Sequence, residues 1–200
     1  MEQIRTFIAI ELSQGLKDSL IRLQDRLKRQ VVKRSLRWAR PEGIHLTLKF
    51  LGNVPAPRIA SVSRAVEAAC EGFDQFTVEL AGMGCFPNPR RPRVVWVGVR
   101  EPTGTLVRLH KAVESALVEL GFEPEDRSFS PHLTLGRVQR KVSRSDLQRL
   151  GELIAESDVG LLGSMTVLSV NVMRSDLRPD GAVYTVLTHV PLGSGGHALS

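Results

Sequence analysis

Two short segments of the sequence each place a threonine two residues after a histidine: His45 with Thr47, and His132 with Thr134. Both segments alternate with leucines, which predicts strands in which each His–Thr pair shares one face. Histidine can donate or accept a proton near neutral pH, and a threonine hydroxyl can donate to a phosphate oxygen. Two such strands side by side would suit an in-line displacement at phosphorus. One motif can occur by chance, but two copies favour a functional site over a purely structural role.

The doubled motif resembles that of the 2H phosphoesterases, and the surrounding sequence narrows the resemblance. The segments that carry it are RTFIAI at 5–10, WARPEGIHLTLKFL at 38–51, FPN at 86–88 followed by RVVW at 93–96, and SPHLT at 130–134. Together they resemble the RNA 2′,3′-cyclic phosphodiesterase branch, also called 2′-5′ RNA ligase. The resemblance extends from about residue 3 to about residue 190.

This resemblance implies an activity and a set of roles. It implies hydrolysis of a 2′,3′-cyclic phosphate at an RNA 3′ end, such as that of a tRNA half, to a 2′-phosphate, with no metal or other cofactor. We expect His132 to remove a proton from water and His45 to protonate the departing 3′ oxygen. Thr47 and Thr134 would bind the non-bridging oxygens, whose charge grows in the transition state.

Basic residues near the motifs are further candidates for contact with the substrate. Arg137 follows the second motif as the family pattern leads us to expect, but strict alternation places it opposite His132 unless the strand ends or bulges. Lys49 is expected on the same face as the first histidine, as an RNA contact. Arg90 and Arg91 lie in a proline-rich loop and are expected to contact RNA as well, since basic clusters attract phosphates.

Hydrophobic periodicity predicts the elements that would position these residues. Helices are predicted over 14–33, 57–71, 104–120 and 145–156, where apolar residues recur at helical spacing. Strands are predicted over 6–12, 36–39, 44–51, 76–81, 93–100, 132–138, 162–173 and 182–191. The glycines and prolines of segment 82–89 predict a loop between two strands.

The order of these elements predicts an α+β protein with an internal duplication, because an H-x-T strand ends a helix–strand run in each half. The resemblance implies two pseudo-symmetric lobes of antiparallel sheet with flanking helices, facing each other across an active-site groove. Periodicity alone does not show that the two motif strands meet. We expect one bilobal domain over 1–191 and a flexible, polar tail over 192–200.

Three other functions are compatible with parts of the sequence. The same site could join RNA ends through a 2′-5′ linkage without ATP, although hydrolysis should prevail in water. A non-catalytic RNA-binding module would not require a histidine in both motifs. A metal site on His45 and His132 lacks the carboxylate or thiolate partners that usually complete one.

Composition places the chain among ordinary globular proteins. Its 200 residues are 42% hydrophobic and 24% charged, with a net charge of +6. Eight Lys or Arg residues and one acid lie within 22–40, which fits a solvated helix face or a phosphate-binding surface equally well. Two cysteines form no disulfide framework, and no segment suggests a membrane span or secretory signal. We therefore expect a cytoplasmic monomer.

Overall fold

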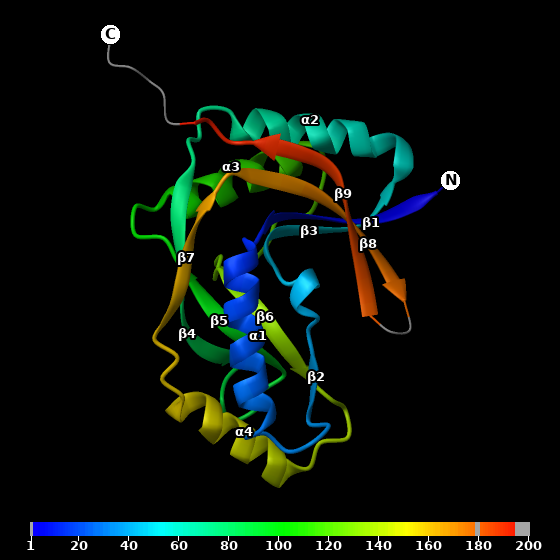
Figure 1. Ribbon diagram of the computed structural model, residues 1–200. Helices are drawn as coiled ribbons and strands as arrows, with labels where there is room; N and C mark the ends of the chain where they lie inside the picture. Colours follow the sequence, from blue (N-terminus) through cyan, green and yellow to red (C-terminus); the bar gives the residue numbers. More distant parts are fainter. Residues whose placement is uncertain (1, 179–180, 195–200) are drawn as a thin grey trace.

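In the computed structural model, the described residues (2–178 and 181–194) form two antiparallel sheets with helices packed against them (Figure 1). The first sheet has the order β3-β1-β8-β9: β1 (Gln3–Glu11), β3 (His45–Pro55), β8 (Ser169–Arg178) and β9 (Gly181–Pro191). The second has the order β2-β6-β5-β4-β7: β2 (Leu36–Trp38), β4 (Phe76–Phe86), β5 (Val94–Arg100), β6 (His132–Val138) and β7 (Leu161–Val167). The predicted α+β class with two antiparallel sheets is confirmed.

Four α-helices of the described chain pack against these sheets: α1 (Gln14–Lys28), α2 (Ile59–Cys70), α3 (Thr105–Glu119) and α4 (Arg144–Glu156). Single 3₁₀ turns precede β3 and α2: η1 (Pro41–Gly43) and η2 (Ala56–Arg58). Helices α2 and α3 pack against each other and against the first sheet, while α1 and α4 contact the second. Leucines at helical spacing are buried along α1, as predicted, and each contributes about 1.5–3 kcal/mol to folding.

Helix α1 ends five residues before its predicted boundary. The chain turns after Lys28, and Arg34 adopts a positive φ of 64° that redirects it into β2. Helix α4 begins one residue earlier than predicted, because the hydroxyl of Ser143 caps it by accepting a hydrogen bond from the backbone N–H of Asp146.

Two predicted strand boundaries are wrong, for different reasons. The predicted strand over 162–173 is two strands, β7 and β8, which belong to different sheets and are separated by the exposed Leu168. Polar and apolar residues alternate along this segment, and the alternation shifts by one residue at Val167 and Leu168, where the chain changes sheet. The predicted loop over 82–89 is strand as far as Phe86. Gly84 in this strand lies under the ring of Trp96, and a Cβ there would be 2.4 Å from the ring. That glycine permits close packing rather than a turn.

The C-terminal segment is packed further than predicted. Leu192 is buried, and Gly193 forms a bridge with Asp74. The rest of the predicted tail, 195–200, lies outside the described residues.

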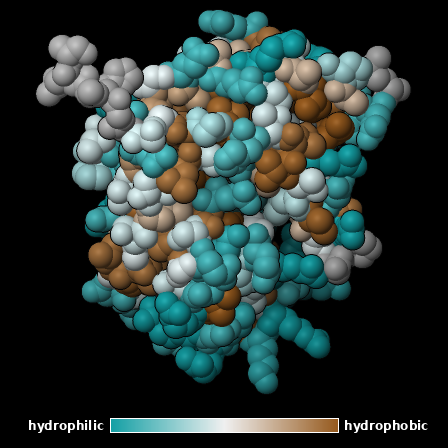
Figure 2. Space-filling model, turned by 45° about the horizontal axis from the view of Figure 1, so that its top comes forward, coloured by the Kyte–Doolittle hydropathy of each residue, from teal (hydrophilic) through white to brown (hydrophobic). Residues whose placement is uncertain are grey.

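Side chains on the surface shown in Figure 2 are mixed in character. Hydrophobic residues form several separate patches interrupted by hydrophilic ones, and the lower edge of this view is largely hydrophilic. Among the described residues, no helix combines the length and hydropathy needed to cross a bilayer.

Candidate active site

Both H-x-T motifs begin a strand, and the two strands lie against each other. β3 starts at His45 and β6 at His132, and β3 contacts β6 between the sheets. The intervening leucines, Leu46 and Leu133, are buried, while the histidines and threonines are half-buried. The structure thus shows what the sequence could not, namely that the two strands that begin with the motifs contact each other.

A β-bulge directly follows the motif in β3. Ala9 of β1 pairs with Thr47 and Ile8 with Lys49, which leaves Leu48 without a partner. The extra residue reverses the alternation of the strand beyond it. Phe50, which pairs with Phe7, therefore lies on the face of Thr47 and is 64% exposed, whereas Lys49 turns to the opposite face and is buried. The prediction that Lys49 shares a face with the first histidine is wrong.

An equivalent bulge follows the motif in β6. Trp96 of β5 pairs with Thr134 and Val95 with Gly136, so the unpaired residue is Leu135. Arg137 then pairs with Val94, on the same face as Trp96 and Thr134, and its side chain is exposed. This is the bulged arrangement that brings the guanidinium to the side of the histidine and threonine.

The ring of His45 lies in an aromatic environment that the sequence did not reveal. Its centroid is 4.6 Å from Phe7 and 4.9 Å from Tyr184, which meets it edge-on. Burial lowers the pKa of His45 to about 4; a hydrogen bond to the backbone of Gly43 opposes this shift, and the charge of Lys17 adds to it. His45 is therefore neutral at neutral pH in the free protein.

The ring of His132 is held by one defined hydrogen bond. Its Nδ1 donates to the carbonyl oxygen of Ser130 at 2.7 Å. Because a carbonyl can only accept, Nδ1 carries the proton, and Nε2 of the neutral ring is left with a lone pair. Phe86 meets the ring edge-on at 4.9 Å, and Trp96 lies 6.3 Å away.

Lys49 connects the first motif strand to the segment that leads into the second. Its Nζ donates to Oε1 of Glu114 at 2.6 Å and to the carbonyl oxygen of Glu123 at 2.8 Å. The backbone N–H of Glu125 donates to the same carboxylate oxygen. Burial raises the pKa of Glu114, but these hydrogen bonds outweigh it and hold the pKa below its usual value. Lys49 is therefore placed to support the fold rather than to contact RNA.

A stacked pair lies beside this ion pair. The rings of His110 and Phe129 are parallel, with centroids 3.8 Å apart. Burial lowers the pKa of His110, and a hydrogen bond to the backbone of the bulged Leu48 opposes this shift. His110 is one of the buried residues of α3.

A polar group on the motif face of the first sheet was also missed. Asn171 of β8 pairs with Ala9 of β1, and Ala9 pairs on its other side with Thr47 of β3. Its amide donates to Glu11 at 2.7 Å, and Nδ1 of His189 donates to its oxygen at 3.0 Å. These residues are far apart in the sequence and carry no motif, so only the strand register brings them together.

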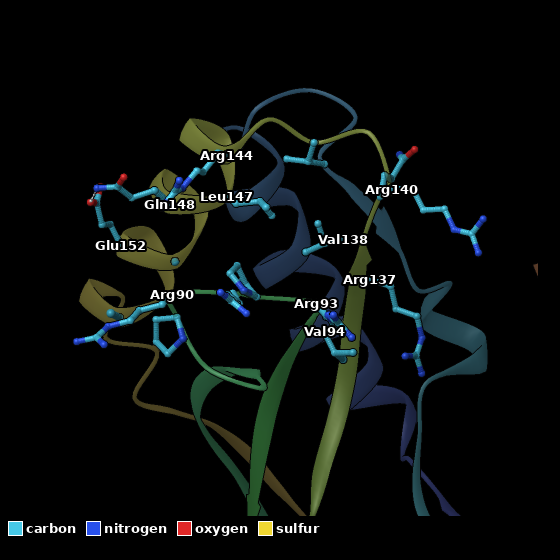
Figure 3. A pocket seen from close by; sticks show the side chains of 17 residues that line it. Arg90, Arg93, Val94, Arg137, Val138, Arg140, Arg144, Leu147, Gln148 and Glu152 are labelled. Carbon is cyan, nitrogen blue, oxygen red and sulfur yellow. Dashed lines mark hydrogen bonds between the residues drawn. The ribbon is translucent and has the colours of Figure 1, made fainter.

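Arg90 and Arg91 lie away from the motifs themselves, in the exposed loop between β4 and β5. Together with Arg137 they line a cavity of about 1450 Å³ between this loop, the end of β6 and α4 (Figure 3). Within residues 2–178 and 181–194, no three His, Cys, Asp or Glu side chains are grouped as metal ligands.

Comparison with known proteins gives consistent matches. The family model described as LigT like Phosphoesterase matches the chain twice, over residues 10–96 and 97–184, so each match contains one H-x-T motif. A protein of Methanothermobacter thermautotrophicus named RNA 2′,3′-cyclic phosphodiesterase is 39% identical over 92% of this chain and 96% of its own length.

Solved structures show the same fold. The crystal structure of TT0787 of Thermus thermophilus has a TM-score of 0.79 and 27% identity, covering 96% of this chain and 100% of that one. Escherichia coli LigT, crystallised with 3′-AMP, has a TM-score of 0.75 and 26% identity, covering 96% and 99%.

Proposed function

Because the chain belongs to the family of LigT-like phosphoesterases, we propose that it is an RNA 2′,3′-cyclic phosphodiesterase that forms a 2′-phosphate. The observation that carries this proposal is the contact between β3 and β6, each with the histidine and threonine of its motif on one face. The relatives' name supports the choice of substrate. The nucleotide bound to E. coli LigT supports a nucleotide-sized site.

His132 is the general base of the proposed reaction. With the proton of the neutral ring on Nδ1, Nε2 can accept a proton from water. The resulting hydroxide forms the new bond to phosphorus, and the bond from phosphorus to the 3′ oxygen breaks. His45 donates a proton to that oxygen. The two histidines end the reaction with exchanged protonation states, which solvent restores.

The charge that develops on the non-bridging oxygens is stabilised by groups on the same faces. The hydroxyls of Thr47 and Thr134 donate to these oxygens, one from each sheet. Arg137 adds a charged donor from β6, because the bulge at Leu135 places it on the face of Thr134. These groups and the histidines carry out the reaction without a Lewis acid.

The low pKa of His45 in the free protein makes its protonation depend on the substrate. An anion at hydrogen-bonding distance raises the pKa of an imidazole, so the bound phosphodiester restores the proton that His45 must donate. NMR titration should therefore show a pKa of His45 well above 4 when a nucleoside 2′-phosphate is bound. If the pKa stays near 4 in the complex, His45 is neutral there, and the acid and base roles are reversed.

The site acts, in this proposal, on RNA fragments such as tRNA halves and within a cytoplasmic monomer. Incubation of the protein with a nucleoside 2′,3′-cyclic phosphate and excess chelator tests the reaction directly. We expect sustained turnover and a nucleoside 2′-phosphate as the product. A 3′-phosphate product, or activity that disappears with chelator and returns with a divalent ion, would refute the proposed chemistry.

A further inference from the structure

The cavity between the 87–93 loop, the end of β6 and α4 has an unusual concentration of positive charge. Six of its 17 lining residues are arginines, against one carboxylate, Glu152. The six are Arg90, Arg91, Arg93, Arg137, Arg140 and Arg144. All are exposed, and none forms an ion pair with a carboxylate in the part of the chain that the structure describes.

Two features indicate that these six arginines are suited to bind an anion. Arg37 of β2 lies directly opposite Arg137 in the strand pairing, and like charges in such a pair are destabilising. The single lining carboxylate already accepts a hydrogen bond from Gln148. A bound polyanion would relieve the repulsion that the protein itself leaves uncompensated.

The loop that carries three of these arginines is held in place. Oδ1 of Asn88 accepts hydrogen bonds from the backbone N–H groups of Arg90 and Arg91. The carbonyl of Pro89 packs so closely on α4 that a Cβ on Gly151 would lie 1.9 Å from its oxygen. A loop fixed at both points loses less conformational entropy on binding.

The cavity has an apolar interior between its charged edges. Figure 3 shows Val138 and Leu147 pointing towards each other and Arg90 lying near α4. Arg137 of β6 and Arg140 of the segment after it extend to the other side of that strand. Apolar surface beside guanidinium groups suits bases and phosphates together. Its volume of about 1450 Å³ exceeds the roughly 300–1,000 Å³ of a pocket for one small ligand.

Arg137 belongs to both the cavity and the proposed active site. It lies on the face of Thr134 and also lines the cavity. We infer that this cavity binds the nucleotides on the 5′ side of the cyclic phosphate, with the arginines on the RNA backbone. The inference rests on the proposed function and extends it, since it makes the protein prefer an RNA end over a free nucleotide.

The test compares two substrates with two pairs of substitutions. The substrates are a nucleoside 2′,3′-cyclic phosphate and a single-stranded oligoribonucleotide that ends in the same group. The test variant is Arg140→Ala with Arg144→Ala. The matched control is Arg64→Ala with Arg108→Ala, which removes two exposed arginines from α2 and α3 instead. Melting temperature is measured for each protein.

We expect the test variant to lower kcat/KM for the oligoribonucleotide about tenfold relative to the mononucleotide, and the control to leave this ratio unchanged. The salt dependence of oligoribonucleotide binding should fall by about 1.4 in log–log slope, at roughly 0.7 for each lost phosphate contact. The inference would be overturned if the test variant left the ratio of the two kcat/KM values unchanged, whether both substrates lost activity equally or neither did.

A binding measurement separates this inference from the proposed function. Fluorescence anisotropy with an oligoribonucleotide ending in a 2′-phosphate requires no turnover. Weaker binding by the test variant supports the cavity assignment even if no cyclic phosphate is hydrolysed, whereas unchanged binding refutes it even if the mononucleotide is turned over. An acidic peptide that competes as well as RNA of equal charge would refute the assignment to nucleic acid.

Discussion

The two H-x-T strands share a backbone design but differ in the side chains that surround it. Each has a bulge directly after the motif, at Leu48 in β3 and Leu135 in β6. The exposed position beyond the bulge is Phe50 in the first strand and Arg137 in the second. The duplicated backbone places the proposed catalytic pair, and the residues beyond it distinguish an aromatic half from a half with an exposed cation.

The strands beside the motifs show the same contrast. The residue that pairs with the motif threonine is the small Ala9 in the first sheet and the large Trp96 in the second. Beyond Ala9 lies the polar Asn171, whereas Gly84 lies beyond Trp96 and under its ring. This asymmetry between otherwise equivalent halves gives the two proposed proton-transfer groups different surroundings.

Loss of either histidine should have the largest effect. His45→Ala or His132→Ala should each lower kcat by about 10²–10⁴, because each removes one proton-transfer group. The double variant should lose less than the product of the single losses, since the two groups act as a unit. Rates and melting temperatures are measured together. Activity lost only in proportion to folded protein would show that the histidines are structural.

The buried ion pair should matter mainly for stability. Lys49→Met leaves the carboxylate of Glu114 without its main partner and should cost about 3 kcal/mol in the free energy of unfolding. Adding Glu114→Gln should recover part of this loss, because no unpaired charge remains. Denaturant unfolding of both variants measures the effect. If the folded Lys49→Met protein turned over a mononucleotide much more slowly than the wild type, Lys49 would instead take part in the reaction.

The positions beyond the two bulges should differ in their contribution to activity. Arg137→Ala removes a charge-assisted hydrogen bond to phosphate and should lower kcat/KM for a mononucleotide about 10- to 100-fold. Phe50→Ala, at the equivalent position of β3, should change it less than the arginine variant does. The contrast between the halves would fail if the phenylalanine variant lost more activity than the arginine variant.

The environment of His45 should make the stability of the protein depend on pH. Its pKa is about 4 in the folded protein, against an ordinary value of 6.5, so the unfolded chain binds more protons between these two values. The free energy of unfolding should therefore fall by about 2–3 kcal/mol as pH falls from 6.5 to 4. His45→Gln should reduce this slope while His110 remains in both proteins. An unchanged slope would show that burial does not perturb His45.

The sequence predicted the strands that carry the two motifs more completely than the residues around them. The strand over 132–138 was predicted at its observed boundaries, because its alternation is regular as far as the bulge. The alternation of 45–50 could not reveal that Lys49 and Phe50 exchange faces, since the bulge arises from the register with β1. The contacts of Tyr184 and Asn171 depend on β8 and β9 joining the first sheet, which no local pattern encodes.

The pH dependence of kcat in the single variants shows whether the two histidines perform opposite proton transfers. The wild-type profile should be bell-shaped, because one imidazole must be neutral and the other protonated. His132→Ala should lose the low-pH limb, where the base becomes protonated, and His45→Ala should lose the high-pH limb, where the acid loses its proton. If both variants kept the wild-type bell at reduced height, or if the two lost limbs were interchanged, His132 would not be the base and His45 would not be the acid.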